Sequence, residues 1–175
     1  MATGNIFLVG MMGAGKTTIG RALARKLGLA FADADKELVT RTGAAVATIF
    51  EIEGEAGFRK RESALLAELA AGENSVIATG GGVVLAEENR KVMRERGTVV
   101  YLRARVESLW ERTRHNSSRP LLATPDPRAT LATLLEQREP LYLEVAHLVV
   151  DTGPQSPSAL ATRLAATLRQ QAGPA

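Results

Sequence analysis

The sequence predicts an α/β protein, a three-layer α/β/α sandwich built around a five-stranded parallel sheet. Two observations carry this prediction. Five short apolar runs alternate along the chain with stretches of helical pattern, and the first run, at 6–9, leads through a glycine-rich loop into a helix. Strands that alternate with helices imply right-handed crossovers, which cover both faces of a parallel sheet.

The order of elements follows from these patterns. The predicted strands are 6–9, 30–32, 75–78, 98–102 and 147–150. The predicted helices are 17–29, 34–41, 44–51, 55–71, 86–96, 106–114, 128–145 and 158–171. Gly43, Gly54 and Gly97 stop or separate helices.

One segment, 116–127, interrupts the alternation. Its sequence, NSSRPLLATPDP, holds three prolines, which disfavour a helix, and we expect its Leu121–Leu122 pair to be exposed. Such a segment between two helices is either a connector or a mobile lid. Arg119 favours the lid, which we place at about 112–127.

Length and composition indicate one globular domain, 1–175, with 45% hydrophobic and 23% charged residues. No apolar stretch approaches the roughly 20 residues of a membrane span, and the start lacks the pattern of a secretory signal. The chain has no cysteine, which excludes disulfides and thiolate chemistry and fits a cytoplasmic location. We expect a monomer with a disordered tail at 171–175.

The charge balance argues against a nucleic-acid partner. The 22 basic and 19 acidic residues leave a net charge of only +3, and no run of lysine and arginine stands out. A mild basic excess suits small anionic ligands.

The glycine-rich loop predicts a phosphate site. Gly10 to Thr17 fits G-x-x-x-x-G-K-[ST] between a strand and a helix, so backbone N–H groups and the helix N-terminus can face phosphates. Lys16 would reach the β- and γ-phosphates and the Thr17 hydroxyl would bind Mg²⁺. A turn that only packs a helix on a strand needs neither side chain. The predicted nucleotide-binding residues are Gly13, Ala14, Gly15, Lys16, Thr17 and Thr18.

Carboxylates for the metal should follow the strands, because ligands of open α/β sheets bind at the carboxyl ends. The strands at 75–78 and 98–102 end without one, which leaves Asp33, Asp35 and Asp151. In an extended segment Asp33 and Asp35 would point to the same side, one to the metal's water shell and one to a substrate hydroxyl. Alternatively, Asp35 only caps the next helix. Spacing leaves these two interpretations even.

Three consecutive glycines, Gly80 to Gly82, end the third strand. They can bring backbone N–H groups against a ligand, and we favour this over a tight turn, which needs fewer glycines. The cations available for phosphoryl oxygens or an acidic substrate are Arg59, Arg103, Arg112, Arg119 and Arg138. Spacing does not tell which of them converge. We expect structural roles for His147 and Trp110 and none for His115.

Taken together, the motifs resemble shikimate kinase over about residues 5–160. The motifs that carry the resemblance are GMMGAGKTTIGRALA, FADADKELVTRTG, IFEIEGEAGFRKRE, ATGGGVV, RPLL and REPLY, in this order. The phosphate loop alone is common to many nucleotide-binding proteins, whereas D-x-D, G-E-x-x-F-R-x-x-E and the triple glycine are more specific.

The resemblance implies a P-loop kinase of the nucleoside monophosphate kinase type, with ATP and Mg²⁺ as cofactors. It would move the γ-phosphoryl of ATP to the 3-hydroxyl of shikimate, a step toward chorismate and the aromatic amino acids. Lys16, Asp35 and Arg119 would be catalytic, and Thr17 and, through water, Asp33 would hold the metal. Shikimate would bind to Asp35, Arg59, Gly80, Gly81, Gly82 and Arg138. Glu62 would orient Arg59, and Arg112 and Pro157 would sandwich the adenine.

Two other functions stay open at this point. Another small-molecule or nucleoside monophosphate kinase on the same core would not require G-E-x-x-F-R-x-x-E. A noncatalytic nucleotide-binding switch would have no reason to retain Lys16, Thr17, Asp33, Asp35 and Arg119 together.

Overall fold

The computed structural model describes residues 4–116 and 119–173. Its five strands form one parallel sheet in the order β2-β3-β1-β4-β5, which confirms the predicted sheet. The strands are β1 (Asn5–Val9), β2 (Ala30–Asp33), β3 (Ser75–Ala78), β4 (Gly97–Arg103) and β5 (Leu148–Asp151). Every bound lies within one residue of the predicted run.

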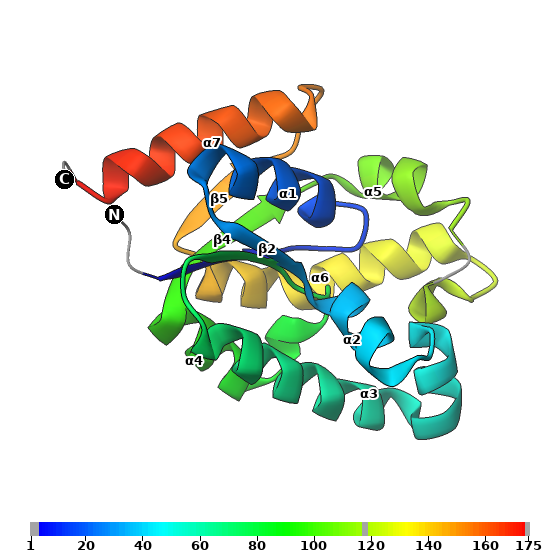
Figure 1. Ribbon diagram of the computed structural model, residues 1–175. Helices are drawn as coiled ribbons and strands as arrows, with labels where there is room; N and C mark the ends of the chain where they lie inside the picture. The colour runs from blue at the N-terminus through cyan, green and yellow to red at the C-terminus, as the bar shows by residue number, and fades with distance from the viewer. Residues whose placement is uncertain (1–3, 117–118, 174–175) are drawn as a thin grey trace.

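Helices cover both faces of this sheet. They are α1 (Lys16–Leu27), α2 (Ala34–Thr42), α3 (Val46–Ala71), α4 (Glu87–Arg96), α5 (Val106–Thr113), α6 (Pro127–Val145) and α7 (Pro157–Gln171). Two short 3₁₀ helices add to them, η1 (Val83–Leu85) and η2 (Pro120–Leu122). Figure 1 shows α1 and α7 on one face and α3, α4 and α6 on the other, the predicted three-layer sandwich.

Of three local expectations, the helix break at Gly54 and the helix end at Gly97 are confirmed, and the exposure of Leu122 is wrong. The helices predicted at 44–51 and 55–71 run on as α3, in which Gly54 alone leaves helical geometry, with φ 72° and ψ 177°. A residue with φ > 0 breaks the helical path, and glycine adopts it without steric cost. In the proline-rich segment, 120–122 form η2, and Leu122 is buried in the main core instead of exposed, because η2 packs on α6 and α3. Gly97 both ends α4 and begins β4.

Parts of two further expectations lie outside the described residues. These are 117–118 within the proposed lid and 174–175 within the expected tail. Among the helices of the described ranges, none is long and apolar enough to cross a membrane.

The strand register places three loops at one edge of the sheet. Ala78 of β3 pairs with Leu8 of β1 on one side and with Asp33 of β2 on the other. The loop after β1, the start of α2 and the triple glycine after β3 therefore begin at the same level. Helix α1 lies tightly behind them, since a Cβ on Gly20 would come within 2.9 Å of Leu8 and Phe31.

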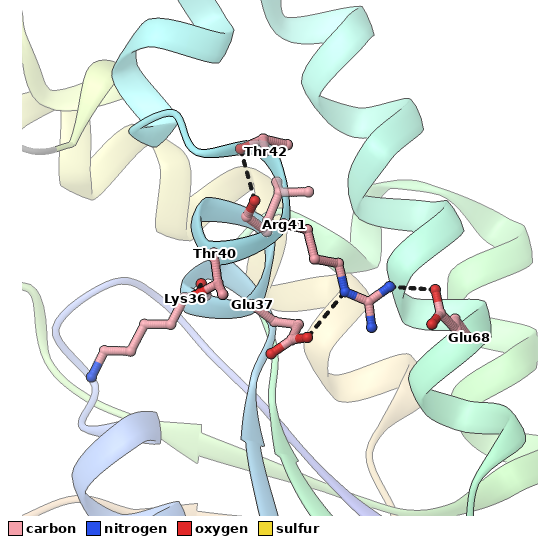
Figure 2. A network of polar contacts seen from close by, with 7 residues as sticks. Lys36, Glu37, Thr40, Arg41, Thr42 and Glu68 are labelled. Carbon is pink, nitrogen blue, oxygen red and sulfur yellow. Dashed lines mark hydrogen bonds and ion pairs between the residues drawn. The ribbon is translucent and has the colours of Figure 1, made fainter.

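A small second cluster joins α2 to α3. Leu38, Ile49, Phe58 and Leu65 are buried together away from the sheet. On its solvent side, Arg41 of α2 bonds Glu37 of the same helix at 3.0 Å and Glu68 of α3 at 2.5 Å (Figure 2). Exposed ion pairs contribute little to stability, so the apolar cluster does most to hold α2 against α3.

Candidate functional site

A cavity of about 840 Å³ opens at the carboxyl edge of the sheet. The loop after β1 forms one side of it, and α2 and the first half of α3 form the opposite side. The predicted site residues that line it are Gly13, Gly15, Lys16, Thr17, Thr18, Asp33, Asp35, Arg59, Gly80, Gly81, Gly82, Arg112, Arg119 and Arg138. Glu62 also lines it. Tertiary structure thus gathers residues that are up to 125 positions apart in the chain.

The loop after β1 curls around the Lys16 ammonium. Gly15 takes the left-handed conformation at the start of α1, with φ 96° and ψ 18°. The Lys16 Nζ donates hydrogen bonds to the carbonyls of Gly10 at 2.5 Å and Met11 at 2.9 Å. Burial lowers the pKa of Lys16 to about 7, and the positive charge of Arg119 acts in the same direction. An anionic ligand beside this ammonium would restore its charge.

The Asp33 carboxylate accepts hydrogen bonds both from the phosphate loop and from α2. Its Oδ2 accepts a hydrogen bond from the Thr17 hydroxyl, and its Oδ1 accepts one from the Lys36 N–H at 3.1 Å. Asp33 is therefore the N-cap of α2. The capping role that spacing allowed for Asp35 belongs to Asp33 instead.

Asp35 lies in the first turn of α2, so the extended segment assumed for the two aspartates is wrong beyond Asp33. Both carboxylates line the cavity all the same. Burial raises the pKa of Asp35, and the nearby Lys16 opposes this shift. A half-buried carboxylate across from a lysine suits a hydroxyl donor in the cavity.

The pair Thr17 and Asp33 offers oxygen ligands of the kind that Mg²⁺ prefers. Within 4–116 and 119–173, no group of three His, Cys, Asp or Glu side chains could hold a metal by itself. The residues present therefore fit a magnesium ion that takes its other ligands from phosphate oxygens and water, as in nucleotide sites.

The triple glycine makes room for charged side chains. A Cβ on Gly82 would lie 2.3 Å from Nη1 of Arg59. On Gly80 it would lie 2.5 Å from Oε2 of Glu62 and 3.0 Å from Oδ1 of Asp35. A tight turn alone does not require such openings, so packing of charged groups against the backbone explains the glycines.

Glu62 sits behind Arg59 on the same helix. Its Oε1 accepts from Arg59 Nη1 at 3.0 Å, while the more exposed Glu55 accepts from Nη2 at 3.3 Å. Glu62 is only 6% exposed. Burial raises the pKa of its carboxyl, and the adjacent Arg59 opposes that shift. These two bonds hold the guanidinium of Arg59 in place and leave its Nε–H available to donate to a ligand.

Four buried polar atoms at the cavity have no hydrogen-bond partner among the described residues. They are Arg59 Nε, Glu62 Oε2, Arg119 Nε and Arg138 Nη1. An unsatisfied buried group costs about 1–3 kcal/mol, and more when it is charged, so a native protein rarely keeps four together without a ligand. Three of the four belong to arginines, which favours an anionic ligand.

Of the remaining candidates, Arg103, Asp151 and Pro157 lie outside the cavity lining, and Arg112 lies at the mouth of the cavity. Arg103 Nε donates a hydrogen bond to Asp151 Oδ1 at 2.7 Å on the surface. Neither residue lines the cavity, so the expectation that they are candidate site residues is wrong. The Nη1 of Arg112 donates to the Gly13 carbonyl at 3.0 Å at the mouth. Pro157 begins α7 and is not among the lining residues.

The remaining residues have structural surroundings. His147 Nδ1 accepts from the Val99 N–H at 2.9 Å beside β4, and Trp110 packs half-buried against the core. Within the phosphate loop, the Ala14 side chain is fully buried and does not line the cavity. The apolar wall of the cavity was not predicted, because apolar residues on a helix normally indicate core. In this wall the rings of Phe50 and Phe58 lie tilted at 38°, with centroids 4.7 Å apart.

Comparison with known proteins identifies the family. The family model described as shikimate kinase matches residues 12–169. The shikimate kinase of Nitrosospira multiformis is 58% identical over 167 residues, which cover 95% of this chain and 86% of that protein. This chain belongs to the shikimate kinase family. The shikimate kinase of Bordetella avium is 64% identical over 148 residues, 85% of this chain and 71% of that one.

Solved structures of the family agree. The shikimate kinase of Acinetobacter baumannii in complex with shikimate superimposes with a TM-score of 0.95 at 44% identity, over 98% of this chain and 96% of that one. The deoxyadenosine kinase of M. mycoides, 16% identical with a TM-score of 0.61, shares the fold alone. The fold is thus that of the P-loop kinases, as the sequence predicted.

Proposed function

We propose that this protein transfers the γ-phosphoryl of ATP to the 3-hydroxyl of shikimate, giving shikimate 3-phosphate and ADP. The reaction is a step toward chorismate and the aromatic amino acids. The observation that carries the proposal is the convergence of Arg59, Arg119 and Arg138 on one cavity, each with a buried N–H that lacks a protein partner. Membership of the family supports the same activity.

The acceptor would lie between α3 and the triple glycine. Arg59 and Arg138 suit the shikimate carboxylate because a guanidinium presents paired donors to a planar carboxylate. Glu62 keeps Arg59 in place, and the glycines at 80–82 line the same pocket. Asp35 would accept a hydrogen bond from the attacking hydroxyl and align it with the γ-phosphorus.

The donor would lie on the phosphate loop. Residues 13–18, which include Lys16, would hold the phosphates of ATP. Mg²⁺, when bound, would neutralise charge on the β- and γ-oxygens. Thr17 would hold the metal directly and Asp33 through water. Because the transition state of phosphoryl transfer is loose, little basicity is required of Asp35, and positioning is its main contribution.

The segment at about 112–127 would act as the lid over both substrates. Arg119 lines the cavity from this segment and would bring its charge to the transferred phosphoryl group. Closure would exclude water, which otherwise hydrolyses ATP. Arg112 and Pro157 would hold the adenine from either side.

The protein would work as a monomeric enzyme of one domain, 1–175, in the cytoplasm. Its partners would be small molecules, with neither nucleic acid nor membrane. The modest net charge of +3 supports the expectation that nucleic acid is not a partner.

The decisive experiment measures ADP formation from ATP and Mg²⁺ with shikimate, gluconate, AMP or no acceptor. We expect turnover with shikimate alone. Lys16→Ala should abolish that turnover and keep the fold, as judged by circular dichroism. Activity with another acceptor would overturn the roles of Arg59 and Arg138, and silence with every acceptor would favour the nucleotide-binding switch.

A further inference from the structure

Behind the triple glycine lies a buried tyrosine that the proposed mechanism does not use. Tyr142 on α6 is fully buried, and its hydroxyl donates a hydrogen bond to the Gly81 carbonyl at 2.5 Å. It lies one helical turn after Arg138, which is 2% exposed, so both side chains come from the same face of α6. One helix face thus lines the cavity through Arg138 and supports the cavity residue Gly81 from behind through Tyr142.

Gly81 stands between the two halves of the site. A Cβ placed on it would lie 3.3 Å from Arg138 Nη1, 3.5 Å from the Met12 nitrogen and 3.6 Å from the Gly10 carbonyl oxygen. The backbone of Gly81 therefore fills the space between the arginine and the phosphate loop. A shift of this backbone by a few tenths of an ångström changes the distance from the acceptor site to the donor site.

The direction of the Tyr142 hydrogen bond is defined by its neighbours. Burial raises the pKa of Tyr142 to about 12, with Arg138 opposing the shift, so the phenol keeps its proton at neutral pH. Arg138 can only donate, whereas a carbonyl can only accept. The hydroxyl proton therefore goes to Gly81, and the oxygen lone pairs face the arginine.

The ring of Tyr142 is fixed as well. It stacks on Tyr101 with ring centroids 4.9 Å apart and an angle of 24°, and the Tyr101 hydroxyl donates to Glu139 at 3.0 Å. Tyr101 and Tyr142 are the two tyrosines of the chain. The pair supplies a matched control, because the hydroxyl of Tyr101 reaches α6 and not the glycines.

We propose that Tyr142 is a positioning residue for the phosphoryl acceptor. Its hydroxyl holds the Gly81 carbonyl, and through Gly81 it sets the place of the Arg138 guanidinium relative to the phosphate loop. This inference rests on the proposed function, since it assumes that Arg138 binds the acceptor carboxylate.

The test compares Tyr142→Phe with Tyr101→Phe. For Tyr142→Phe we expect the KM for shikimate to rise about tenfold, because a buried carbonyl loses its donor, while the KM for ATP changes less than about twofold. Tyr101→Phe should leave both KM values near wild type. A tyrosine of purely structural importance would lower Tm in both variants without separating the two KM values.

A substrate analogue locates the effect. When the carboxylate of shikimate is reduced to an alcohol, wild type and Tyr142→Phe should bind it about equally in calorimetric titrations, since Arg138 then has no carboxylate to meet. An equal loss of affinity for shikimate and for the alcohol would overturn the inference. So would a wild-type KM for shikimate in Tyr142→Phe.

A second measurement covers the case in which Tyr142→Phe does not fold. In Tyr101→Phe labelled with 3-fluorotyrosine, the single ¹⁹F signal comes from position 142. It should shift when shikimate is added and stay in place with the alcohol, and no shift with shikimate would overturn the inference. If wild type itself fails to phosphorylate shikimate, the proposed function fails and the inference loses its premise, whereas a wild-type KM for shikimate in an active Tyr142→Phe overturns the inference alone.

Discussion

The backbone of Gly82 faces the guanidinium of Arg59 so closely that a Cβ would lie 2.3 Å from Nη1 and 2.4 Å from Cζ. The backbone angles of Gly82, φ −95° and ψ 6°, are open to any residue. Glycine is therefore required here for space and not for conformation. The group in the way is the far end of a flexible side chain, which can move without disturbing the core.

Gly82→Ala should consequently impair substrate binding more than stability. We expect the methyl group to displace Arg59 from the cavity and to raise the KM for shikimate by about tenfold or more, the effect of losing one charge-assisted contact. Steady-state kinetics with shikimate varied at saturating ATP measures this, with Tm measured in parallel.

Gly72→Ala is the matched control, because its φ of −76° is also ordinary and a Cβ there would meet only the Leu69 carbonyl at 3.5 Å. It should behave as wild type. A large drop in Tm with an unchanged KM in Gly82→Ala would contradict the steric role.

The lowered pKa of Lys16 predicts that ATP binding takes up a proton. With a pKa of about 7 in the free protein, Lys16 is largely neutral at pH 8, and phosphates beside it favour the charged form. Binding should then capture up to one proton at pH 8, and ATP affinity should fall as pH rises above 7. Titration calorimetry in two buffers with different ionisation enthalpies measures the uptake.

Lys16→Arg is the control for this coupling, because a guanidinium keeps its charge at every working pH. Its binding heats should be independent of the buffer. If wild type and Lys16→Arg show the same proton uptake at pH 8, then Lys16 is not its source.

Asp35→Asn should lower turnover by roughly two orders of magnitude or more, because an amide aligns the attacking hydroxyl poorly and accepts no proton. The fold should survive, since Asp33 and not Asp35 caps α2. Protonation removes the acceptor, so wild-type turnover should fall as pH drops through the raised pKa of Asp35. A pH profile of kcat for both proteins tests this.

Glu37→Gln serves as the control for Asp35→Asn. It makes the same chemical change two residues further along α2, where the side chain pairs with Arg41 at the surface. Near-normal turnover in Asp35→Asn would show that the carboxylate is dispensable for catalysis.

Arg119→Ala should spare shikimate binding and damage catalysis. Arg119 precedes η2, and its buried Nε has no hydrogen-bond partner among the residues described. If it stabilises the transferred phosphoryl group, kcat should fall about 10²- to 10³-fold while calorimetric affinity for shikimate stays within a factor of two.

The control in the same segment is Arg114→Ala, since Arg114 lies at the surface with Glu111 at 3.7 Å. Its kinetics should match wild type. A defect confined to shikimate affinity in Arg119→Ala would move Arg119 from the lid to the acceptor site.

Much of this architecture follows from local patterns. The parallel sheet and its strand bounds follow from five apolar runs, and Gly15 and Lys16 mark the helix start because the phosphate loop is a contiguous motif. The break at Gly54 was likewise predicted from one residue. Each of these features depends on neighbours within a few positions, where backbone geometry and periodicity act directly.

Errors arose where distant elements meet. Leu122 was expected at the surface and is buried, because η2 docks on α6 and α3. Asp151 ends a strand like Asp33, yet it pairs with Arg103 outside the cavity. Asp33 caps α2 in place of Asp35, because α2 begins at Ala34 directly after β2 and Asp35 already lies in its first turn.

By itself, the sequence determined the fold class, the phosphate loop and, through its motifs, the family. Only the tertiary structure decided which arginines converge, why Gly80 and Gly82 leave no room for a side chain, and that Tyr142 lies behind Gly81. The physical reason is that the packing of α3 and α6 against the sheet sets these contacts. Burial then shifts the pKa values of Lys16 and Asp35, and no local pattern encodes that burial.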